Sequence, residues 1–327
     1  MIYSNLFSAV IVSFVTAFCA IPLLIRLAPL IGAIDQPDGK LKQQKVPVAY
    51  LGGLGVYIGF ITSTLLLSLW HEHIVFFIIG STVLLLVGLV DDFFILAPSQ
   101  KFLAQIAAAI FFLKGGYYIK ATFLSNYLNL GISLFWILSI INAFNLIDVM
   151  DGLAATVAIG VCGTFLGISL LLGNMEIALI LSCFLGAILA FFWYNKPPAR
   201  IYLGDAGSHF IGGFLATIPF AISWSELNPW GFFVPVAVLA IPSLELLSLM
   251  VIRTYKGIPF YQGSRDHFCH YLLNKGWSKQ YILWYLLLLS LFIFVVVNLF
   301  LSNIICLWQF LCFGGAFFGF WISNLVY

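Results

Sequence analysis

Apolar runs of membrane-spanning length constrain the fold of this chain more than any other feature. They lie at roughly 4–30, 51–70, 74–92, 101–119, 127–147, 152–173, 175–194, 207–224, 230–252, 281–301 and 304–324. Hydrophobic residues make up 63% of the 327 and charged residues 8%, whereas roughly half of an ordinary soluble chain is apolar. About 20 helical residues cross a bilayer. We therefore predict an all-α polytopic integral membrane protein with about 10–11 transmembrane helices, in which residues 1–327 form a single domain.

The basic residues predict how the chain is oriented in the membrane. Residues 1–25 carry no side-chain charge, and Arg26 follows the first apolar run. A signal peptide has the opposite order, so we expect a retained first helix with its N-terminus outside. One face then receives twelve of the fourteen Lys and Arg residues, and the other receives only Lys114 and Lys120. The excess predicts that the first face is cytoplasmic.

The acidic residues follow the same division. Nine of the twelve fall in or near the cytoplasmic loops: Asp35, Asp38, Asp91, Asp92, Asp148, Asp151, Asp205, Glu245 and Asp266. Ionisable groups beside hydrocarbon are costly and are functional candidates by default. We therefore expect the chemistry at the inner face of the membrane.

The segment Asn142-Ala-Phe-Asn145-Leu-Ile-Asp148-Val-Met-Asp151-Gly152 is the densest polar group between two apolar runs. If the helix continues through it, Asn145 and Asp148 share a face. If the helix ends at Asp151-Gly152, the carboxylates would cap the next helix. A polar knot between helices is the structural alternative, and four spaced polar groups favour a functional site over it.

Two further acidic positions stand at predicted helix ends. Asp91-Asp92 closes the third run, where the helix dipole disfavours anions, and Lys101 follows within reach of a phosphate or carboxylate. Asp205 lies between glycines before another apolar run, where it could cap the helix or hold a cation. Carboxylate and amide oxygens without nearby His or Cys favour Mg²⁺ over Zn²⁺.

Basic groups gather in two of the same loops. Lys40, Lys42 and Lys45 lie in the first, where they could attract an anion or simply reflect the positive-inside bias. The loop at 253–272 carries Arg265 and the sequence His267-Phe-Cys-His270. These donors could bind phosphate oxygens, while a zinc site or a solvated basic loop are the alternatives. Metal-type and phosphate-type groups together suit transfer of a phosphorylated group to a lipid.

At these residues the chain resembles the polyprenyl-phosphate N-acetylhexosamine-1-phosphate transferases, of glycosyltransferase family 4. The resemblance covers nearly the whole chain and rests on Asp91-Asp92 and on the segments 145–153, 204–208 and 266–270. It implies transfer of a sugar 1-phosphate, most simply GlcNAc 1-phosphate, from a UDP-sugar to undecaprenyl phosphate, with release of UMP. The expected setting is the bacterial inner membrane, as the first membrane step of a cell-envelope glycan. No nucleic-acid partner is expected, and a homodimer stays open.

The resemblance also assigns roles to the acidic and amide residues. Asp91 would activate the lipid phosphate, with Asp92 and Asp148 grouped beside it as catalytic residues. Asn145 and Asp205 would bind Mg²⁺, which Mn²⁺ could replace, and Asp148 would belong to the surroundings of the metal.

Five residues are implied to bind the substrates. Asp151 would contact the uracil, while Lys101, Arg265, His267 and His270 would hold phosphates.

The choice of donor is less constrained. The family branch that transfers phospho-N-acetylmuramoyl-pentapeptide carries three adjacent His residues where this chain has His267-Phe-Cys-His270, which favours a smaller N-acetylhexosamine donor. Glu245 resembles the muramoyl branch instead, and Gln44 stands where many relatives carry His. The peptidoglycan transferase is therefore the alternative within the family.

Two rival classes fit less well. A polytopic transporter would place its binding groups near the bilayer midplane, whereas these groups line one face. An intramembrane aspartyl protease is suggested by Gly204-Asp205, but it would need one partner Asp within a helix and not five polar loops.

Overall fold

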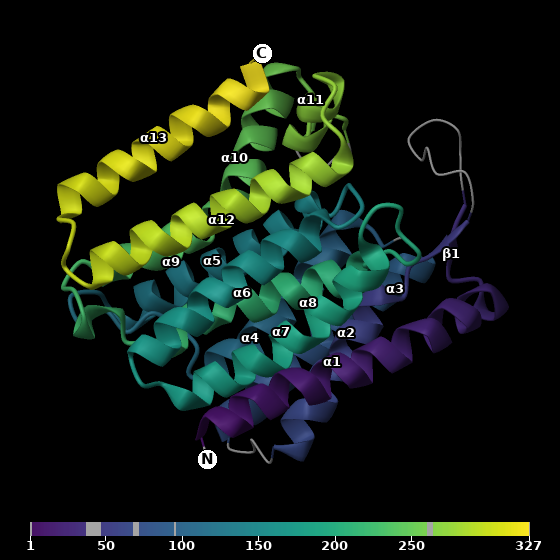
Figure 1. Ribbon diagram of the computed structural model, residues 1–327, viewed down its shortest axis with the longest axis horizontal. Helices are drawn as coiled ribbons and strands as arrows, with labels where there is room; N and C mark the ends of the chain where they lie inside the picture. The colour runs from purple at the N-terminus through teal and green to yellow at the C-terminus, as the bar shows by residue number, and fades with distance from the viewer. Residues whose placement is uncertain (1, 37–46, 68–71, 95, 260–263, 327) are drawn as a thin grey trace.

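The described residues, 2–36, 47–67, 72–94, 96–259 and 264–326, form a helical bundle with one small sheet in this computed structural model (Figure 1). The α-helices are α1 (Ile2–Leu27), α2 (Gly52–Leu66), α3 (Glu72–Phe94), α4 (Pro98–Lys114), α5 (Asn126–Ile147), α6 (Leu153–Leu171), α7 (Met175–Asn195), α8 (Gly204–Thr217), α9 (Val234–Val238), α10 (Ala240–Tyr255), α11 (Phe268–Asn274), α12 (Lys279–Leu301) and α13 (Leu307–Val326). Short 3-10 segments are η1 (Ala28–Ile31), η2 (Ile218–Ala221), η3 (Trp224–Glu226) and η4 (Gly231–Phe233). The predicted all-α class is confirmed.

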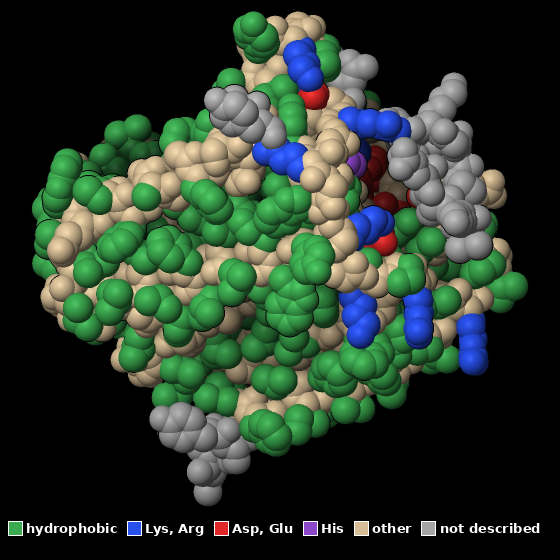
Figure 2. Space-filling view, turned by 45° about the horizontal axis from the view of Figure 1, so that its top comes forward, with side chains coloured by type: hydrophobic (Ala, Val, Ile, Leu, Met, Phe, Trp, Pro, Cys, Tyr) green, Lys and Arg blue, Asp and Glu red, His purple; other side chains and the backbone are tan. Residues whose placement is uncertain are grey.

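Membrane-spanning character is concentrated in a subset of the helices. By length and composition, six of the described helical stretches can cross a bilayer: Asn5–Ile31, Glu72–Phe94, Asn126–Ile147, Leu153–Leu171, Met175–Asn195 and Lys279–Leu301. A seventh span results if the pair Gly231–Val238 and Ala240–Tyr255, bent by 65°, counts as one. The bundle surface is correspondingly apolar, and Figure 2 shows hydrophobic side chains over most of one face. The chain is a multi-pass membrane protein.

Every predicted apolar run contains helix, but several helices are shorter than the run. Helix α4 ends at Lys114, before Gly115-Gly116, and α8 has only 14 residues before a 3-10 segment begins at Ile218. At 1.5 Å per residue, 14 residues reach about 21 Å, which is less than the roughly 30 Å hydrocarbon core. The difference from the predicted 10–11 spans therefore comes in part from the short helices α2, α4 and α8, whereas α13 has 20 residues but is not among the six stretches.

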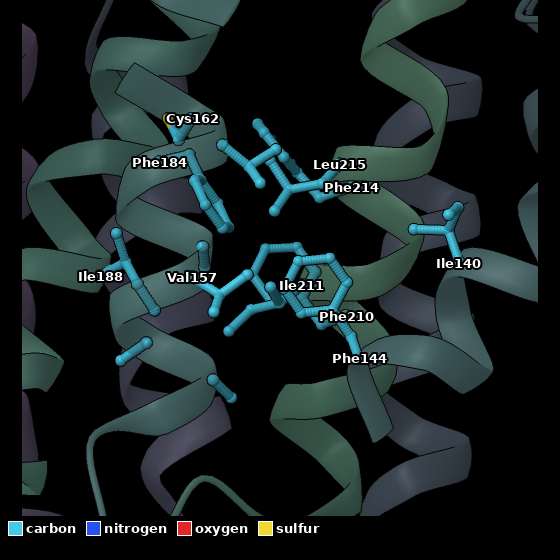
Figure 3. Packing of buried hydrophobic residues seen from close by; sticks show 14 of the residues in the cluster. Ile140, Phe144, Val157, Cys162, Phe184, Ile188, Phe210, Ile211, Phe214 and Leu215 are labelled. Atoms are coloured by element: carbon cyan, nitrogen blue, oxygen red, sulfur yellow. The ribbon is translucent and has the colours of Figure 1, made fainter. Parts of the chain in front are cut away.

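Helix α8 is the buried centre of the bundle. All of its residues from Ala206 to Thr217 are buried. Figure 3 shows its apolar side chains packed between those of α5, α6 and α7. The rings of Phe184 and Phe214 stack with centroids 4.1 Å apart. This packing fixes α8, and hence its N-terminus, relative to the neighbouring helices.

Glycines let α2 and α3 approach the start of α8 closely. A Cβ atom on Gly53 would lie 2.2 Å from the Cα of Gly207, and one on Gly88 would lie 2.3 Å from the Cα of Ala206. These distances are too short for any side chain at either position. Glycine at positions 53 and 88 therefore permits the close approach of α2 and α3 to α8.

A small sheet ties the first loop to the segment that precedes α8. Strands β1 (Ile34–Asp35) and β2 (Val48–Ala49) pair antiparallel, with Ile34 opposite Ala49. Ala49 also forms a parallel bridge with Ile201. The N–H groups of Gly52 and Gly53 donate to the carbonyls of Tyr202 and Leu203, each at 2.9 Å. The start of α2 and the start of α8 are thus joined through their backbones.

Candidate active site

The carboxylate of Asp92 lies at the N-terminus of α8, although it comes from the last turn of α3. Its Oδ1 accepts the backbone N–H of Asp205 at 2.9 Å, and its Oδ2 accepts that of Ala206 at 3.2 Å. These N–H groups belong to the first turn of a helix, where they have no acceptor within the helix. Gly204 has φ +74°, and a Cβ there would lie 2.7 Å from Asp92 Oδ2. Asp92 therefore caps α8 from another helix.

Asp91 and Asp205 meet at the amine of Lys101. Lys101 Nζ donates to Asp205 Oδ2 at 2.8 Å and forms an ion pair with Asp91 Oδ2. The N–H of Leu96 donates to the other oxygen of Asp91 at 2.6 Å, and Asp91 is only 6% exposed. Asp91 and Lys101, which the sequence placed together, are therefore brought into contact with Asp205, which lies more than 100 positions further along the chain.

Asn145 completes this contact from α5. Its Nδ2 donates to Asp205 Oδ1 and to Ser208 Oγ, both at 3.0 Å. Since the amide nitrogen faces α8, the amide oxygen is available to another group. Asn145 and Asp205, the two residues expected to bind Mg²⁺, are thus in direct contact.

The segment after α5 follows neither of the two predicted courses. Helix α5 ends at Ile147, with Asp148 as its C-cap, so the helix does not continue to Asp151. Helix α6 begins after Gly152, which has φ +76°, and no side chain caps it. The expectation that Asp148 and Asp151 cap the next helix was wrong. Both carboxylates instead lie in the turn between the helices.

Asp148 lies in a concentration of negative charge. Burial, followed by the charges of Asp205, Asp92 and Asp151, raises the pKa of Asp148 to about 8. Its carboxylate accepts no hydrogen bond from any described residue. A carboxyl in such surroundings becomes ionised more easily when a cation is bound nearby.

The donor set fits Mg²⁺ in kind. Across the described residues, no group of three or more His, Cys, Asp or Glu is close enough together to form a metal cage. Mg²⁺ does not need one, because it usually binds one or two carboxylates and keeps waters and substrate phosphates as its other ligands. The oxygens of Asp205, Asp148 and Asn145 are of the kind such a site uses.

Asp151 connects the acidic groups to α12. Its Oδ2 accepts Lys279 Nζ at 2.9 Å and the N–H of Ala199 at 3.4 Å. The adjacent Gly152 N–H donates to the buried Asn195 Oδ1 at 2.9 Å. The turn that carries Asp151 is therefore held by two segments that are distant in the sequence, residues 195–199 and the start of α12.

The loop after α10 is held by a buried Glu–His pair. Glu245 Oε1 lies 2.9 Å from His267 Nδ1, and these residues are 1% and 4% exposed. The N–H of Phe268 points at the same carboxylate, 3.4 Å from each oxygen. Glu245 therefore fixes the ring of His267 and leaves its Nε2 for another partner.

His270 and Arg265 lie beside this pair. The rings of His267 and His270 have centroids 6.0 Å apart. Burial, together with the positive charges of His267 and Arg265, lowers the pKa of His270. The two predicted His residues are thus neighbours, and Arg265 is exposed next to them.

Charged groups surround a hollow on this face of the molecule. In Figure 2, acidic side chains lie inside the hollow, a histidine adjoins them, and Lys and Arg side chains stand around it. Lys40, Lys42, Gln44 and Lys45 lie outside the described residues.

Four features of the site were not predicted from the sequence. They are the capping role of Asp92, the Asp151–Lys279 pair, the Glu245–His267 pair and a contact between Gln105 and His209. Spacing gave a usable signal for the last, since Gln105 and His209 each follow a site residue by four positions. The other three join segments with no local relation in the sequence.

A buried short helix whose N-terminus meets Asp, Lys and Asn side chains, at one face of a multi-pass bundle, suits phosphoryl-group chemistry at a membrane. The sequence matches the model of glycosyl transferase family 4 over residues 74–223. The chain belongs to this family and is a phosphotransferase of a bacterial membrane.

Individual relatives carry two different names. The probable undecaprenyl-phosphate N-acetylglucosaminyl 1-phosphate transferase of Bacillus subtilis (strain 168) is 28% identical over 281 residues, covering 83% of this chain and 78% of the relative. The phospho-N-acetylmuramoyl-pentapeptide-transferase of Streptococcus pneumoniae (strain CGSP14) is 32% identical over 246 residues, covering 67% and 75%. That of Thermoanaerobacter sp. (strain X514) is 27% identical over 316 residues, covering 87% and 96%.

Proposed function

We propose that this protein transfers N-acetylglucosamine 1-phosphate from UDP-GlcNAc to undecaprenyl phosphate, giving undecaprenyl-diphosphate-GlcNAc and UMP. The observation that carries the proposal is the convergence of Asp91, Lys101 and Asp205 from three helices. It brings together a carboxylate that can accept a proton, an ammonium group and a carboxylate of the kind that binds Mg²⁺, at one end of the buried helix α8.

The proposed reaction is a nucleophilic displacement at phosphorus. An oxygen of the lipid phosphate attacks the sugar-bearing phosphorus, a new P–O bond forms, and the bond between the two phosphates of the donor breaks. UMP leaves with the bridging oxygen. Asp91 accepts a proton from the lipid phosphate when that phosphate is singly protonated. Lys101, in contact with Asp91, stabilises the charge that develops on the transferred phosphoryl group.

Mg²⁺ would neutralise charge on the donor diphosphate, held by Asp205, Asn145 and Asp148. Asp92 keeps the first turn of α8 in place and so positions Asp205. This arrangement brings the ligand oxygens to one end of α8 without a side-chain cage.

The substrate-binding residues lie around these groups. Asp151, paired with Lys279, would contact the uracil. His267 and His270, with Arg265, would hold the diphosphate through N–H donors. We place this face in the cytoplasm and the N-terminus outside, on the charge distribution of the loops.

The shape of the His loop supports the smaller donor. Phe268 and Cys269, between the two His residues, are 1% and 0% exposed. The Phe268 ring packs against Trp321 with centroids 4.7 Å apart. Phe268 and Cys269 therefore face the protein interior and leave at most the two His residues of this stretch for contact with a donor. The name of the Bacillus subtilis relative supports the same donor.

Transfer of phospho-N-acetylmuramoyl-pentapeptide is the second candidate, favoured by Glu245 and by the Streptococcus pneumoniae relative. The test is a competition between the two UDP-sugar donors, using purified protein in detergent with undecaprenyl phosphate and Mg²⁺. We expect UMP release and a GlcNAc-diphosphate lipid. Preferential consumption of the muramoyl-pentapeptide donor would assign the protein to the second candidate.

A further inference from the structure

A second polar layer lies beneath the Asp205 site, in the interior of the bundle. Asn142 Nδ2 donates to Gln105 Oε1 at 2.9 Å, and Gln105 Nε2 lies 3.3 Å from His209 Nε2. Gln105 and His209 are 2% and 1% exposed. We call Gln105, Asn142 and His209 the inner polar layer.

On each of three helices, the inner polar layer lies about one turn from a residue of the Asp205 site. Gln105 follows Lys101 by four positions on α4, and His209 follows Asp205 by four on α8. Asn142 precedes Asn145 by three on α5. Residues three or four apart lie on the same face of a helix. The three helices that supply Lys101, Asp205 and Asn145 are therefore bridged a second time, directly below.

The direction of the hydrogen bonds fixes the state of His209. Asn142 Nδ2 also donates to the Leu138 carbonyl at 2.7 Å, so the amide presents an N–H to Gln105. Gln105 then turns its own N–H toward His209 Nε2, which must accept it. The ring proton of His209 consequently lies on Nδ1, which has no hydrogen-bond partner among the described residues.

This arrangement is poorly suited to a purely stabilising role. A buried donor without an acceptor costs roughly 1–3 kcal/mol, and an apolar residue in this interior would avoid that cost. What the layer provides is register, because helices sliding past one another would break directional bonds but would only rearrange apolar contacts.

We propose that His209, Gln105 and Asn142 are positioning residues of the phosphotransfer site. They hold α4, α5 and α8 in the register at which Lys101, Asn145 and Asp205 meet, and so set the affinity of that site for a divalent cation. Its test by UMP release rests on the proposed function, whereas its test by metal binding does not.

The decisive variant is His209→Leu, which keeps a side chain of moderate size and removes the acceptor. Two measurements are made on purified full-length protein: the Mn²⁺ or Mg²⁺ concentration for half-maximal UMP release, and that for half-maximal thermal stabilisation without substrates. We expect both to rise about tenfold or more, the usual effect of losing a residue that orients a metal ligand. The KM for undecaprenyl phosphate should stay unchanged, because Gln105 and His209 are buried in the interior of the bundle.

Matched variants separate positioning from general damage. Thr217→Val alters a buried residue of the same helix whose hydroxyl bonds only to its own helix backbone, at Gly213 and Phe214. It should leave both metal concentrations unchanged. His209→Gln can still accept from Gln105 and should recover most of the metal response. Gln105→Leu should behave like His209→Leu, and the double variant should lose little more than either.

The proposal is overturned if His209→Leu responds to metal as the unaltered protein does. It is also overturned if kcat falls with no change in either metal concentration, which would indicate a smaller folded fraction. If the unaltered protein releases no UMP from either UDP-sugar, the proposed function fails. The thermal response to metal still decides the positioning role in that case.

Discussion

The carboxylate of Asp92 accepts the backbone N–H of Asp205, 113 positions further along the chain, at 2.9 Å. Its neighbour Asp91 faces Lys101 instead. Two adjacent acids of the same residue type therefore have different environments, one as the cap of a central helix and the other as the partner of a cation. Substitution should separate their roles.

We expect Asp92→Asn to lower both stability and turnover. An amide can accept only one of the two N–H groups, and its NH₂ would face the other. The free energy of unfolding should fall by about 1 kcal/mol, as for loss of a helix cap. Asp91→Asn should lower kcat about 10²-fold or more at nearly unchanged melting temperature. Equal melting temperatures for Asp92→Asn and the unaltered protein would contradict the capping role.

Lys101→Met should abolish turnover yet strengthen cation binding. The substitution removes the amine that lies between Asp91 and Asp205 and leaves both carboxylates to attract a metal. We expect kcat to fall at least about 10²-fold and the apparent affinity for Mn²⁺, measured by electron paramagnetic resonance, to rise. Weaker Mn²⁺ binding would show that Lys101 supports the metal site through its position.

Thermal stability without divalent cations should fall as the pH rises toward 8, and Asp148 should account for part of the slope. Its pKa is raised to about 8 in the folded protein, while an unfolded chain has a carboxyl pKa of about 4. The contribution of Asp148 is thus fully present below pH 4 and is lost as the pH rises through 8.

Melting curves at pH 6 and pH 8.5 test this. We expect a smaller decrease for Asp148→Asn than for the unaltered protein, since the amide does not ionise. Added Mg²⁺ should stabilise the unaltered protein more at pH 8.5 and stabilise the variant less. Parallel melting curves for the two proteins would exclude Asp148 as the titrating group.

Glu245→Gln should impair donor use through His267. The charged acceptor that orients His267 Nδ1 is lost, so we expect kcat/KM for the UDP-sugar to fall about tenfold or more, as for a charge-assisted hydrogen bond. Glu226→Gln, which alters an exposed acid at the other end of the bundle, is the matched control. A change in kcat/KM for undecaprenyl phosphate alone would place Glu245 at the lipid and not at the donor.

The sequence predicted the residues of the site better than their contacts. Asp91, Lys101, Asn145 and Asp205 were identifiable because polar groups are rare in this chain and each is costly near lipid. The partner of Asp92 was not, because a backbone N–H has no residue type to mark it. The apolar run ends at Ile147, as α5 does. The course of the turn at 148–152 was not predicted, because it depends on Lys279 and Asn195 from other helices.

Helix boundaries show the same limit. The run 230–252 is predominantly apolar, but the helix bends by 65° around Leu239. Pro235 and Pro242 flank that position and are a local signal for a break. Hydrophobicity alone does not register such a break, so the length of an apolar run is a poor guide to the length of a straight helix.

The glycines where α2 and α3 meet α8 bear on how such an enzyme could be redesigned. At Gly53 and Gly88 no side chain fits, and Gly204 needs a left-handed backbone. The reacting centre therefore tolerates almost no substitution in its framework. The loop that carries His267 and His270 is joined to the helices through side chains, chiefly those of Glu245 and Arg253. An engineer who wanted a new sugar donor should therefore graft that loop together with its two anchors and leave the glycine framework intact.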